Sequence, residues 1–139
     1  PRTVEWLETH SVPVVGWQTD EFPAFFSPTA EILLSTKIRN AEEASRLIRA
    51  HRELGLASAI LICVPCPEAE AIPFELVERW LEQALEETAG VHGGSLTPHL
   101  LERMAQLSGG ATLAANRALL LHNAAIAAKI ASALVRDAA

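Results

Sequence analysis

Two asparagines offer the chemistry that is easiest to place in this sequence. Asn116 and Asn123 stand seven residues apart in the longest apolar stretch, so a helix brings both amides to the same side. An amide within a buried stripe is costly unless it is hydrogen-bonded. Because it both donates and accepts, it suits a sugar hydroxyl or a nucleobase edge, although it also suits the backbone of a neighbouring loop. We follow the apolar stripe through Leu113, Leu120, Ala124, Ala127, Ile130 and Leu134.

A second group of polar side chains follows the first apolar run. Thr19, Asp20 and Glu21 come shortly after Val12–Val15, which we interpret as a buried strand. Ligands in open α/β sheets gather outside the carboxyl ends of the strands. The two carboxylates, beside three phenylalanines, are therefore candidates for shaping a pocket. The alternative is that Asp20 caps a short turn while the aromatic rings fill the core.

The cysteines and histidines favour neither a metal site nor a redox centre. Cys63 and Cys66 form a C-x-x-C pattern, but Pro67 follows where a thioredoxin-like motif needs a helix. No further Cys or His pair at motif spacing completes a zinc site. We interpret the two cysteines as small apolar residues at a strand end. Among the histidines, His99 has the best claim to a site, because it follows a predicted helix start.

Composition excludes several classes of partner. The chain has 139 residues, a formal net charge of −6 and a pI of about 5.3, with 11 scattered Lys and Arg residues, which argues against nucleic acid. Polar residues interrupt the apolar region Ala111–Val135, so we expect no membrane segment. Without a signal-peptide pattern, we expect a cytoplasmic protein. The first residue is Pro1 within a helical pattern, so we expect a piece of a longer protein.

Apolar runs alternate with helical patterns, which predicts an α/β layer architecture with some parallel strand pairing. Asn40 is a predicted N-cap with Glu43 at the capping-box position. Thr97 is the predicted cap of a helix that ends near Ser108, and Thr112 is the predicted cap of the last helix. The predicted strands are Val12–Val15, Ile32–Ile38 and Ala59–Val64, and the predicted helices include Thr3–Glu8, Ala41–Leu54, Phe74–Thr88 and Leu113–Arg136.

Three segments resemble one known family, the pseudouridine-5′-phosphate glycosidases, also called indigoidine synthase A-like proteins. The segment 3–25 (TVEWLETHSVPVVGWQTDEFPAF) is similar to the family's LEYLET-GVPVVGY-TDEFPAF. The segment 97–104 (TPHLLERM) resembles TPFLLARV, and 108–119 (SGGATLAANRAL) resembles TGG-SL-ANIAL. Asn123 matches the second Asn of the family's NNA. The resemblance runs essentially end to end.

The resemblance implies an α/β/α sandwich, of which residues 1–139 form a single domain that is the C-terminal portion of a longer glycosidase-like domain. It implies reversible cleavage of the C–C glycosidic bond of pseudouridine 5′-phosphate to uracil and ribose 5-phosphate, usually by a homotrimer. A lysine forms an imine-type adduct with the opened ribose, a glutamate moves protons, and manganese sits in the site. These groups belong to the family's N-terminal half, so we expect them outside this chain. Lys37 and Lys129 do not match the lysine.

The resemblance assigns a substrate-binding role to only a few residues of this chain. Asn116 matches an active-site asparagine that contacts substrate, and Thr19, Asp20 and Glu21 match a loop beside the site. Three positions depart from the family pattern: Val64 replaces the Asn of NPIP, His99 replaces the Phe of TPF, and Trp17 replaces a Tyr. These departures favour an alternative, a secondary-metabolism C-glycosynthase that joins ribose 5-phosphate to an aromatic polyketide. A further alternative is a non-catalytic assembly module.

Overall fold

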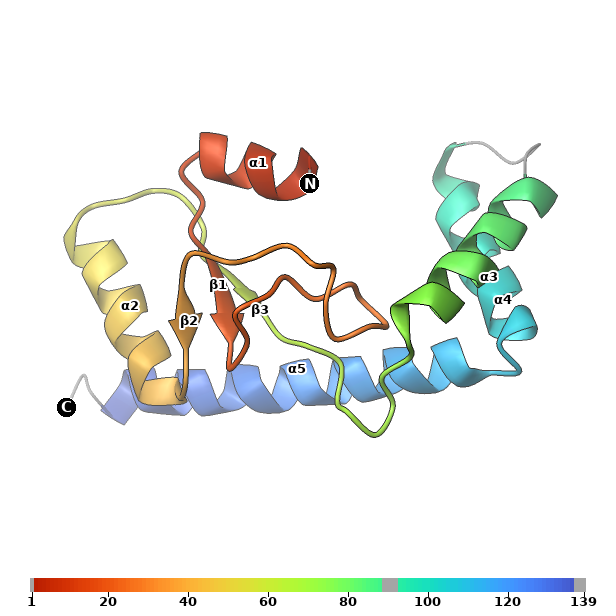
Figure 1. Cartoon of the computed structure of the whole chain (residues 1–139). Coiled ribbons are helices and arrows are strands. Elements are labelled where there is room, and N and C mark those ends of the chain that lie inside the picture. Colours follow the sequence, from red (N-terminus) through yellow and green to blue (C-terminus); the bar gives the residue numbers. More distant parts are fainter. Residues whose placement is uncertain (1, 89–92, 137–139) are drawn as a thin grey trace.

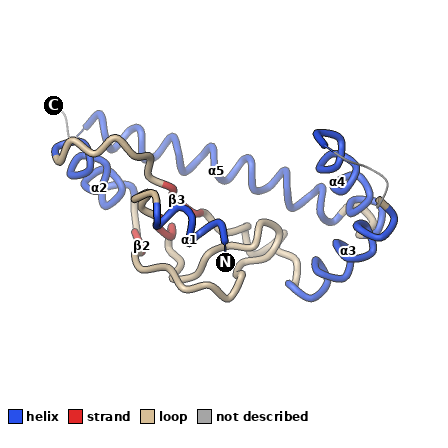
Figure 2. Tube along the Cα trace, turned by 90° about the horizontal axis from the view of Figure 1, so that it is seen from above, coloured by secondary structure: helices blue, strands red, loops and turns tan. Residues whose placement is uncertain are grey.

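The computed structural model describes residues 2–88 and 93–136 as five α-helices, one short 3₁₀ helix and three strands (Figure 1). The last helix, α5, runs along the whole molecule, with α2 at one end and α3 and α4 at the other (Figure 2). The elements are α1 (Arg2–Thr9), β1 (Val14–Trp17), β2 (Lys37–Ile38), α2 (Ala41–Glu53), β3 (Leu61–Cys63), α3 (Phe74–Glu87), η1 (Gly93–Ser95), α4 (Leu96–Leu107) and α5 (Ala111–Arg136).

The three strands form one parallel sheet in the order β2-β1-β3. In its register, Val14 lies opposite Leu61 and Trp17 lies opposite Ile38. The parallel pairing and the α/β class predicted from the sequence are therefore confirmed. All four residues of β1 are buried, as expected of a central parallel strand.

The predicted strand at Ile32–Ile38 is wrong over most of its length, because only Lys37–Ile38 joins the sheet. The residues before it fold back on the preceding loop instead. Leu34 N–H donates to Asp20 O at 2.8 Å, and Phe22 N–H donates to Ile32 O at 2.8 Å. The segment between β1 and β2 is thus an irregular antiparallel loop, which holds its own backbone hydrogen bonds.

One hydrophobic cluster joins the sheet to two helices. Val15, Trp17 and Ile38 from the strands pack against buried alanines of α2 and against α5. Helices α2 and α5 therefore share one face of the sheet. The second helical layer of an α/β/α sandwich stays a prediction. The α5 members of this cluster are Ile126, Ile130 and Ala133.

Helix α2 begins as its sequence predicts. Asn40 Oδ1 accepts from Glu43 N–H at 2.8 Å, which satisfies one of the free N–H groups of the first turn. The Glu43 carboxylate accepts from Arg39 N–H at 2.8 Å rather than from Asn40, so the capping box is displaced by one residue. This backbone hydrogen bond lowers the pKa of Glu43.

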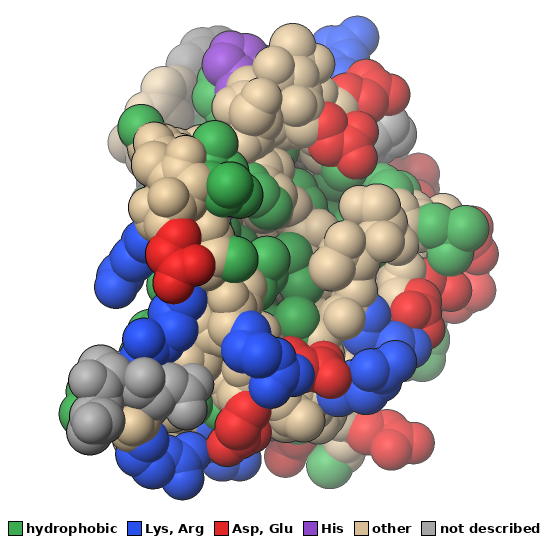
Figure 3. All heavy atoms as spheres, turned by 90° about the vertical axis from the view of Figure 1, so that its left-hand side faces the viewer, with side chains coloured by type: hydrophobic (Ala, Val, Ile, Leu, Met, Phe, Trp, Pro, Cys, Tyr) green, Lys and Arg blue, Asp and Glu red, His purple; other side chains and the backbone are tan. Residues whose placement is uncertain are grey.

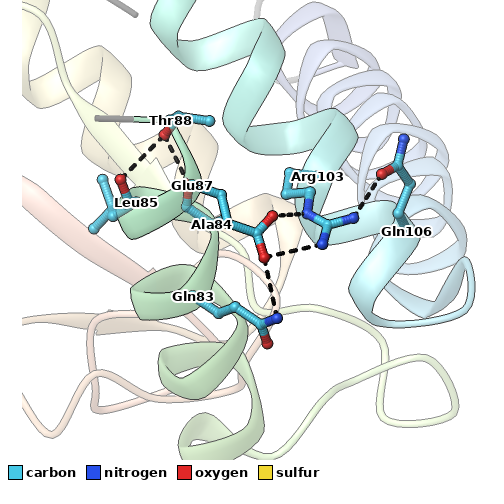
Figure 4. A network of polar contacts seen from close by, with 7 residues as sticks. All are labelled: Gln83, Ala84, Leu85, Glu87, Thr88, Arg103 and Gln106. Carbon is cyan, nitrogen blue, oxygen red and sulfur yellow. Dashed lines mark hydrogen bonds and ion pairs between the residues drawn. The ribbon is translucent and has the colours of Figure 1, made fainter. Parts of the chain in front are cut away.

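The other end of the molecule is a helical pair closed by polar contacts. Helices α3 and α4 pack with α5 in a second hydrophobic cluster, whose buried members include Met104 of α4 and Leu119 of α5. On its surface, the Arg103 guanidinium forms an ion pair with Glu87, and Gln83 and Gln106 hydrogen-bond to either side of that pair (Figure 4). The hydrogen bond from Arg103 lowers the pKa of the Glu87 carboxyl.

Two predicted helix starts are wrong. Helix α4 begins at Leu96, so Thr97 and Pro98 lie inside its first turn and Thr97 is not the cap. Helix α5 begins at Ala111, and its second residue, Thr112, is buried rather than capping. The hydroxyl of Ser108 accepts from Thr112 N–H at 3.2 Å instead. Both predictions placed the cap at the Thr residue nearest the apolar run. In the structure each helix begins one residue before that threonine.

The apolar stripe predicted along α5 is also mostly wrong. Leu113 and Leu120 are each 65% exposed, whereas the buried residues are Thr112, Ala115, Leu119, Ile126, Ile130 and Ala133. The helix is so rich in Ala and Leu that apolar side chains lie on every side of it. Periodicity then cannot identify the buried face, and only the packing partners decide it.

By length and composition α5 is a candidate membrane span, because an 18-residue window has a mean hydropathy of 1.6. This finding is weak, since a long core helix satisfies the same criterion. The buried residues of α5 pack into both hydrophobic clusters, and Lys129 lies on its second half. A charge in hydrocarbon costs at least roughly 2.5–3.5 kcal/mol. We therefore treat α5 as a core helix with exposed apolar positions.

Candidate functional site

A cavity of about 330 Å³ lies where the loop after β1, the end of β3 and the middle of α5 meet. We call it the amide pocket, because its polar side chains are the amides of Asn116 and Asn123. It is uncharged, and its remaining lining is apolar. That lining consists of Phe22, Pro23 and Phe25 from the loop, Leu61, Cys63 and Val64 at β3, and Leu119 and Leu120 from α5.

The two amides of the pocket are free to bind a ligand. Asn116 is half-buried and Asn123 is exposed. Within residues 2–88 and 93–136, no protein group forms a hydrogen bond with either side-chain amide. The interpretation that these asparagines tie a neighbouring loop therefore finds no partner in the described chain. An amide beside apolar walls, with its donors and acceptor unused, is suited to a flat polar edge.

The three polar residues predicted in the loop lie outside the lining of the pocket. Thr19 Oγ1 accepts from Glu21 N–H at 3.1 Å, Asp20 forms an ion pair with Lys37, and the Glu21 carboxylate accepts from the Thr29 hydroxyl. These groups are engaged in holding the loop. Their role in substrate binding stays a prediction, and the loop residues that reach the pocket are instead Phe22, Pro23 and Phe25.

Gly16 fixes the position of this loop. A Cβ at Gly16 would lie 2.1 Å from the Thr19 carbonyl oxygen and 3.1 Å from Leu34 Cδ1. The loop backbone therefore crosses β1 at a distance that only glycine permits. This close approach fixes the path of the loop, whose residues Phe22, Pro23 and Phe25 then line the pocket.

Phe25 is held in an unusual backbone conformation at the rim of the pocket. Its φ of 60° lies in the left-handed region, which bulky residues rarely adopt, and its side chain is 51% exposed. The ring packs edge-on against Phe26 at a centroid distance of 4.4 Å. The turn is fixed by Ser27, whose hydroxyl donates to Ile72 O at 2.7 Å. Strain of this kind persists where the surroundings impose it, and it concentrates at binding sites.

The two cysteines are buried and free, and neither is activated. Burial raises the pKa of Cys63 to about 11. Burial and the nearby Glu70 carboxylate raise the pKa of Cys66. Both thiols therefore stay protonated at neutral pH, which agrees with the prediction of small apolar residues. Cys63 contributes to the wall of the amide pocket.

Only one of the three departures from the family pattern lies in the pocket. Val64 is part of its lining together with Asn116. His99 is exposed on α4, where its Nδ1 hydrogen-bonds to Ser95 O at 2.8 Å. Trp17 is buried in the sheet cluster. Sequence reasoning did not predict that Leu61, Leu119 and Leu120 line the pocket, because apolar residues carry no signal that separates a pocket wall from a core.

A second, larger cavity lies at the α2 end of the molecule. We call it the basic cavity, because Arg39, Lys129 and Arg136 are in its lining, and its volume is about 610 Å³. Figure 3 looks at this end and shows Lys and Arg side chains gathered there, interleaved with acidic ones. Arg136 pairs with Glu42 at 3.1 Å and Arg39 pairs with Glu43 at 3.3 Å.

The described residues do not supply a metal site. Residues 2–88 and 93–136 contain no group of three or more His, Cys, Asp or Glu side chains placed to hold a metal ion. A manganese ion, if it belongs to the complete enzyme, needs ligands from outside these residues.

Comparison with known proteins defines the class of this chain. The sequence profile of the family described as indigoidine synthase A like protein matches residues 1–133. A pseudouridine-5′-phosphate glycosidase from Kosmotoga olearia is 43% identical over 97% of this chain and 47% of its own length. One from Sorangium cellulosum is 43% identical over 96% of this chain and 43% of its own length. The chain belongs to the indigoidine synthase A-like family.

Solved structures agree with this assignment. The crystal structure of the prealnumycin C-glycosynthase AlnA in complex with ribulose 5-phosphate superposes with a TM-score of 0.86 at 32% identity, over 96% of this chain and 44% of that one. An indigoidine synthase A-like protein from Thermotoga maritima superposes with a TM-score of 0.83 at 38% identity, over 93% of this chain and 43% of that one. The chain thus spans less than half the length of the relatives it matches.

Proposed function

We propose that this chain forms the aglycone-binding part of an enzyme that cleaves or forms the C–C bond between ribose 5-phosphate and its aglycone. The substrate of the cleavage reaction is pseudouridine 5′-phosphate. The observation that carries the proposal is the pair of free amides, Asn116 and Asn123, in one otherwise apolar pocket. The names of the curated relatives support the reaction, and the ribulose 5-phosphate complex of a structural relative supports a sugar phosphate as ligand.

The chemistry explains why the pocket needs amides rather than acids. A C–C bond at the anomeric carbon cannot be broken by simple acid hydrolysis of an acetal. A lysine amine that adds to the anomeric carbon opens the ribose ring. When the C–C bond breaks, its electrons stay with the base, whose carbon gains a proton, and the lysine nitrogen stabilises the sugar carbon as an iminium that water then hydrolyses. The protein must then hold the leaving base by its polar edge. Asn116 can accept from a uracil N–H and donate to a uracil carbonyl while remaining neutral.

The other parts of the active site belong, in this proposal, to the section of the relatives that the chain does not span. These parts are the adduct-forming lysine, the proton-transferring glutamate and the manganese ligands. The homotrimer and the cytoplasmic location are proposed on the same family grounds.

A C-glycosynthase is the second candidate, and Val64 is the observation that favours it. Val64 gives the amide pocket an apolar surface near Asn116. An apolar wall suits an aromatic aglycone more than a pyrimidine, which has polar atoms around its rim. This candidate uses the same lysine chemistry in the direction of bond formation.

The test combines the chain, by co-expression, with the complementary portion of the Kosmotoga olearia relative. The complex is incubated with pseudouridine 5′-phosphate and manganese, and uracil release is measured. We expect uracil release that is lost when the lysine of the complementary portion is replaced. A complex that forms an adduct with ribose 5-phosphate but releases little uracil supports the C-glycosynthase. A complex with neither activity contradicts both candidates and supports an assembly module.

A further inference from the structure

The outer edge of β3 has the backbone groups and the composition to pair with another strand. β3 pairs with β1 on one side, and within residues 2–88 and 93–136 no strand pairs with its other side. Leu61 N–H donates to Pro13 O at 2.9 Å, toward β1. Since neighbouring residues in a strand direct their backbone groups to opposite edges, the N–H and C=O of Ile62 point away from the sheet.

This edge lacks the features that protect a permanent sheet edge. Natural edge strands carry charges, prolines or bulges that discourage pairing. The segment 59–64 (AILICV) has only apolar residues, and its first proline is Pro65. Leu61 is 37% exposed at this edge. Strands of this composition are usually covered on both faces and paired on both sides.

An apolar groove runs beside the same edge. A cavity of about 430 Å³ lies between Ile60 and Ile62 on one side and Ile126 and Ile130 on the other. It shares Val64 and Asn123 with the amide pocket, so the two cavities are neighbours that meet at these residues. A segment that covers the groove therefore lies next to the amide pocket.

We propose that a parallel strand docks on the outer edge of β3 and that it comes from the part of the family domain that this chain does not span. The relatives are about twice as long as the matched region, and β3 leaves one edge of the described sheet unprotected. The added strand would hydrogen-bond to Ile62, cover the groove and complete the wall of the amide pocket. The identity of the partner rests on the proposed function, whereas the docking mode rests on the edge itself.

Residue-resolved amide hydrogen exchange distinguishes strand addition from other ways of covering the groove. The chain is compared alone and co-expressed with the complementary portion of the Kosmotoga olearia relative, without substrate. We expect the Leu61 amide to be protected in both states. The Ile62 amide should exchange fast in the chain alone and on the order of 100-fold more slowly in the complex. Fast exchange at Ile62 within a stable complex would overturn the proposal.

The variant Ile62→Pro tests the same contact by affinity. Proline removes the outward-facing N–H, and it also fixes φ and loses part of the packing of Ile62 on the sheet cluster, so affinity is compared well below the melting temperature of the variant, where its circular dichroism matches that of the native chain. The complex should dissociate at least about 10-fold more readily. The matched control, Ile62→Val, keeps the N–H and should bind like the native chain. Equal affinity of the proline variant, or a native chain that pairs with itself through this edge, contradicts the proposal.

These measurements separate docking from activity. A complex with a protected Ile62 amide and no reaction on pseudouridine 5′-phosphate or ribose 5-phosphate would refute the proposed function and leave the docking surface intact. An active complex with an unprotected Ile62 amide would do the reverse.

Discussion

The amide pocket and the basic cavity differ in how their polar groups are used. The basic cavity is nearly twice as large, but two of its three cationic side chains are already paired, Arg136 with Glu42 and Arg39 with Glu43. The amide pocket has no charge, and both of its amides are unused. Asn116 is half-buried and Asn123 is exposed, so a ligand can reach both amides without breaking a protein hydrogen bond. The comparison teaches that the availability of polar atoms, rather than volume, identifies the binding site.

The largest expected effect is on catalysis by the assembled enzyme. Asn116→Leu removes the amide and leaves the polar edge of the base unpaired, so kcat/KM should fall roughly 10–100-fold. Asn123→Leu should lower kcat/KM by a smaller factor, because the Asn123 side chain is exposed. The control is Arg39→Gln in the basic cavity, which should leave the rate near that of the native chain. A larger loss from the arginine variant would reverse the comparison.

The next effect is on the loop that reaches the pocket. Gly16→Ala places a Cβ against the Thr19 carbonyl, so the loop backbone must move. We expect a loss of about 1–3 kcal/mol in the free energy of unfolding, measured by urea denaturation. Gly94→Ala is the control, because a Cβ there meets no atom within 4 Å. Equal stability of the two variants would show that the loop does not need the close approach.

A smaller effect is expected on the choice of aglycone. Val64→Asn adds a third amide to the pocket and should raise the preference for uracil over an aromatic aglycone about 10-fold in relative kcat/KM. Val64→Ala makes room without adding polarity and serves as the control. If both variants change the preference equally, pocket size rather than polarity determines the choice.

The smallest effect is expected at the ion pair between α3 and α4, which is outside the lining of both cavities. Arg103 lowers the pKa of Glu87, so the stabilisation is fully present above the ordinary carboxyl pKa and is lost as the pH falls through the lowered value. Both side chains are partly exposed, so Arg103→Gln should lower the melting temperature at pH 7 by only about 2 °C. The difference between variant and native chain should vanish once the pH is below the lowered pKa of Glu87. A difference that persists there would assign the effect to packing.

The fold could be predicted where the signals are local. Asn40 caps α2 because its side chain bonds within the same turn, and the parallel pairing follows from apolar runs separated by helices. The prediction of a strand over Ile32–Ile38 was wrong because the preceding loop forms backbone hydrogen bonds with residues of this segment. The predicted buried face of α5 was mostly wrong because Ala and Leu lie on every side of the helix.

The site could be predicted only in part. Asn116 could be singled out because an amide is conspicuous in an apolar stretch, and the structure places it in the lining of the amide pocket; its contact with substrate stays a prediction. The placement of Val64 in the same pocket depends on tertiary contacts, and that of Phe25 at the rim depends on a left-handed backbone that local propensity disfavours. The polar residues Thr19, Asp20 and Glu21 drew attention through their chemistry, although their bonds serve the loop itself.

The central claim is that the amide pocket holds the aglycone, and a structure of the assembled complex with pseudouridine 5′-phosphate tests it most directly. We predict that the base lies in the amide pocket, with its polar edge within hydrogen-bonding distance of the Asn116 amide and one face against Val64. A base bound in the basic cavity, or one in the amide pocket without a hydrogen bond to Asn116, would contradict the account.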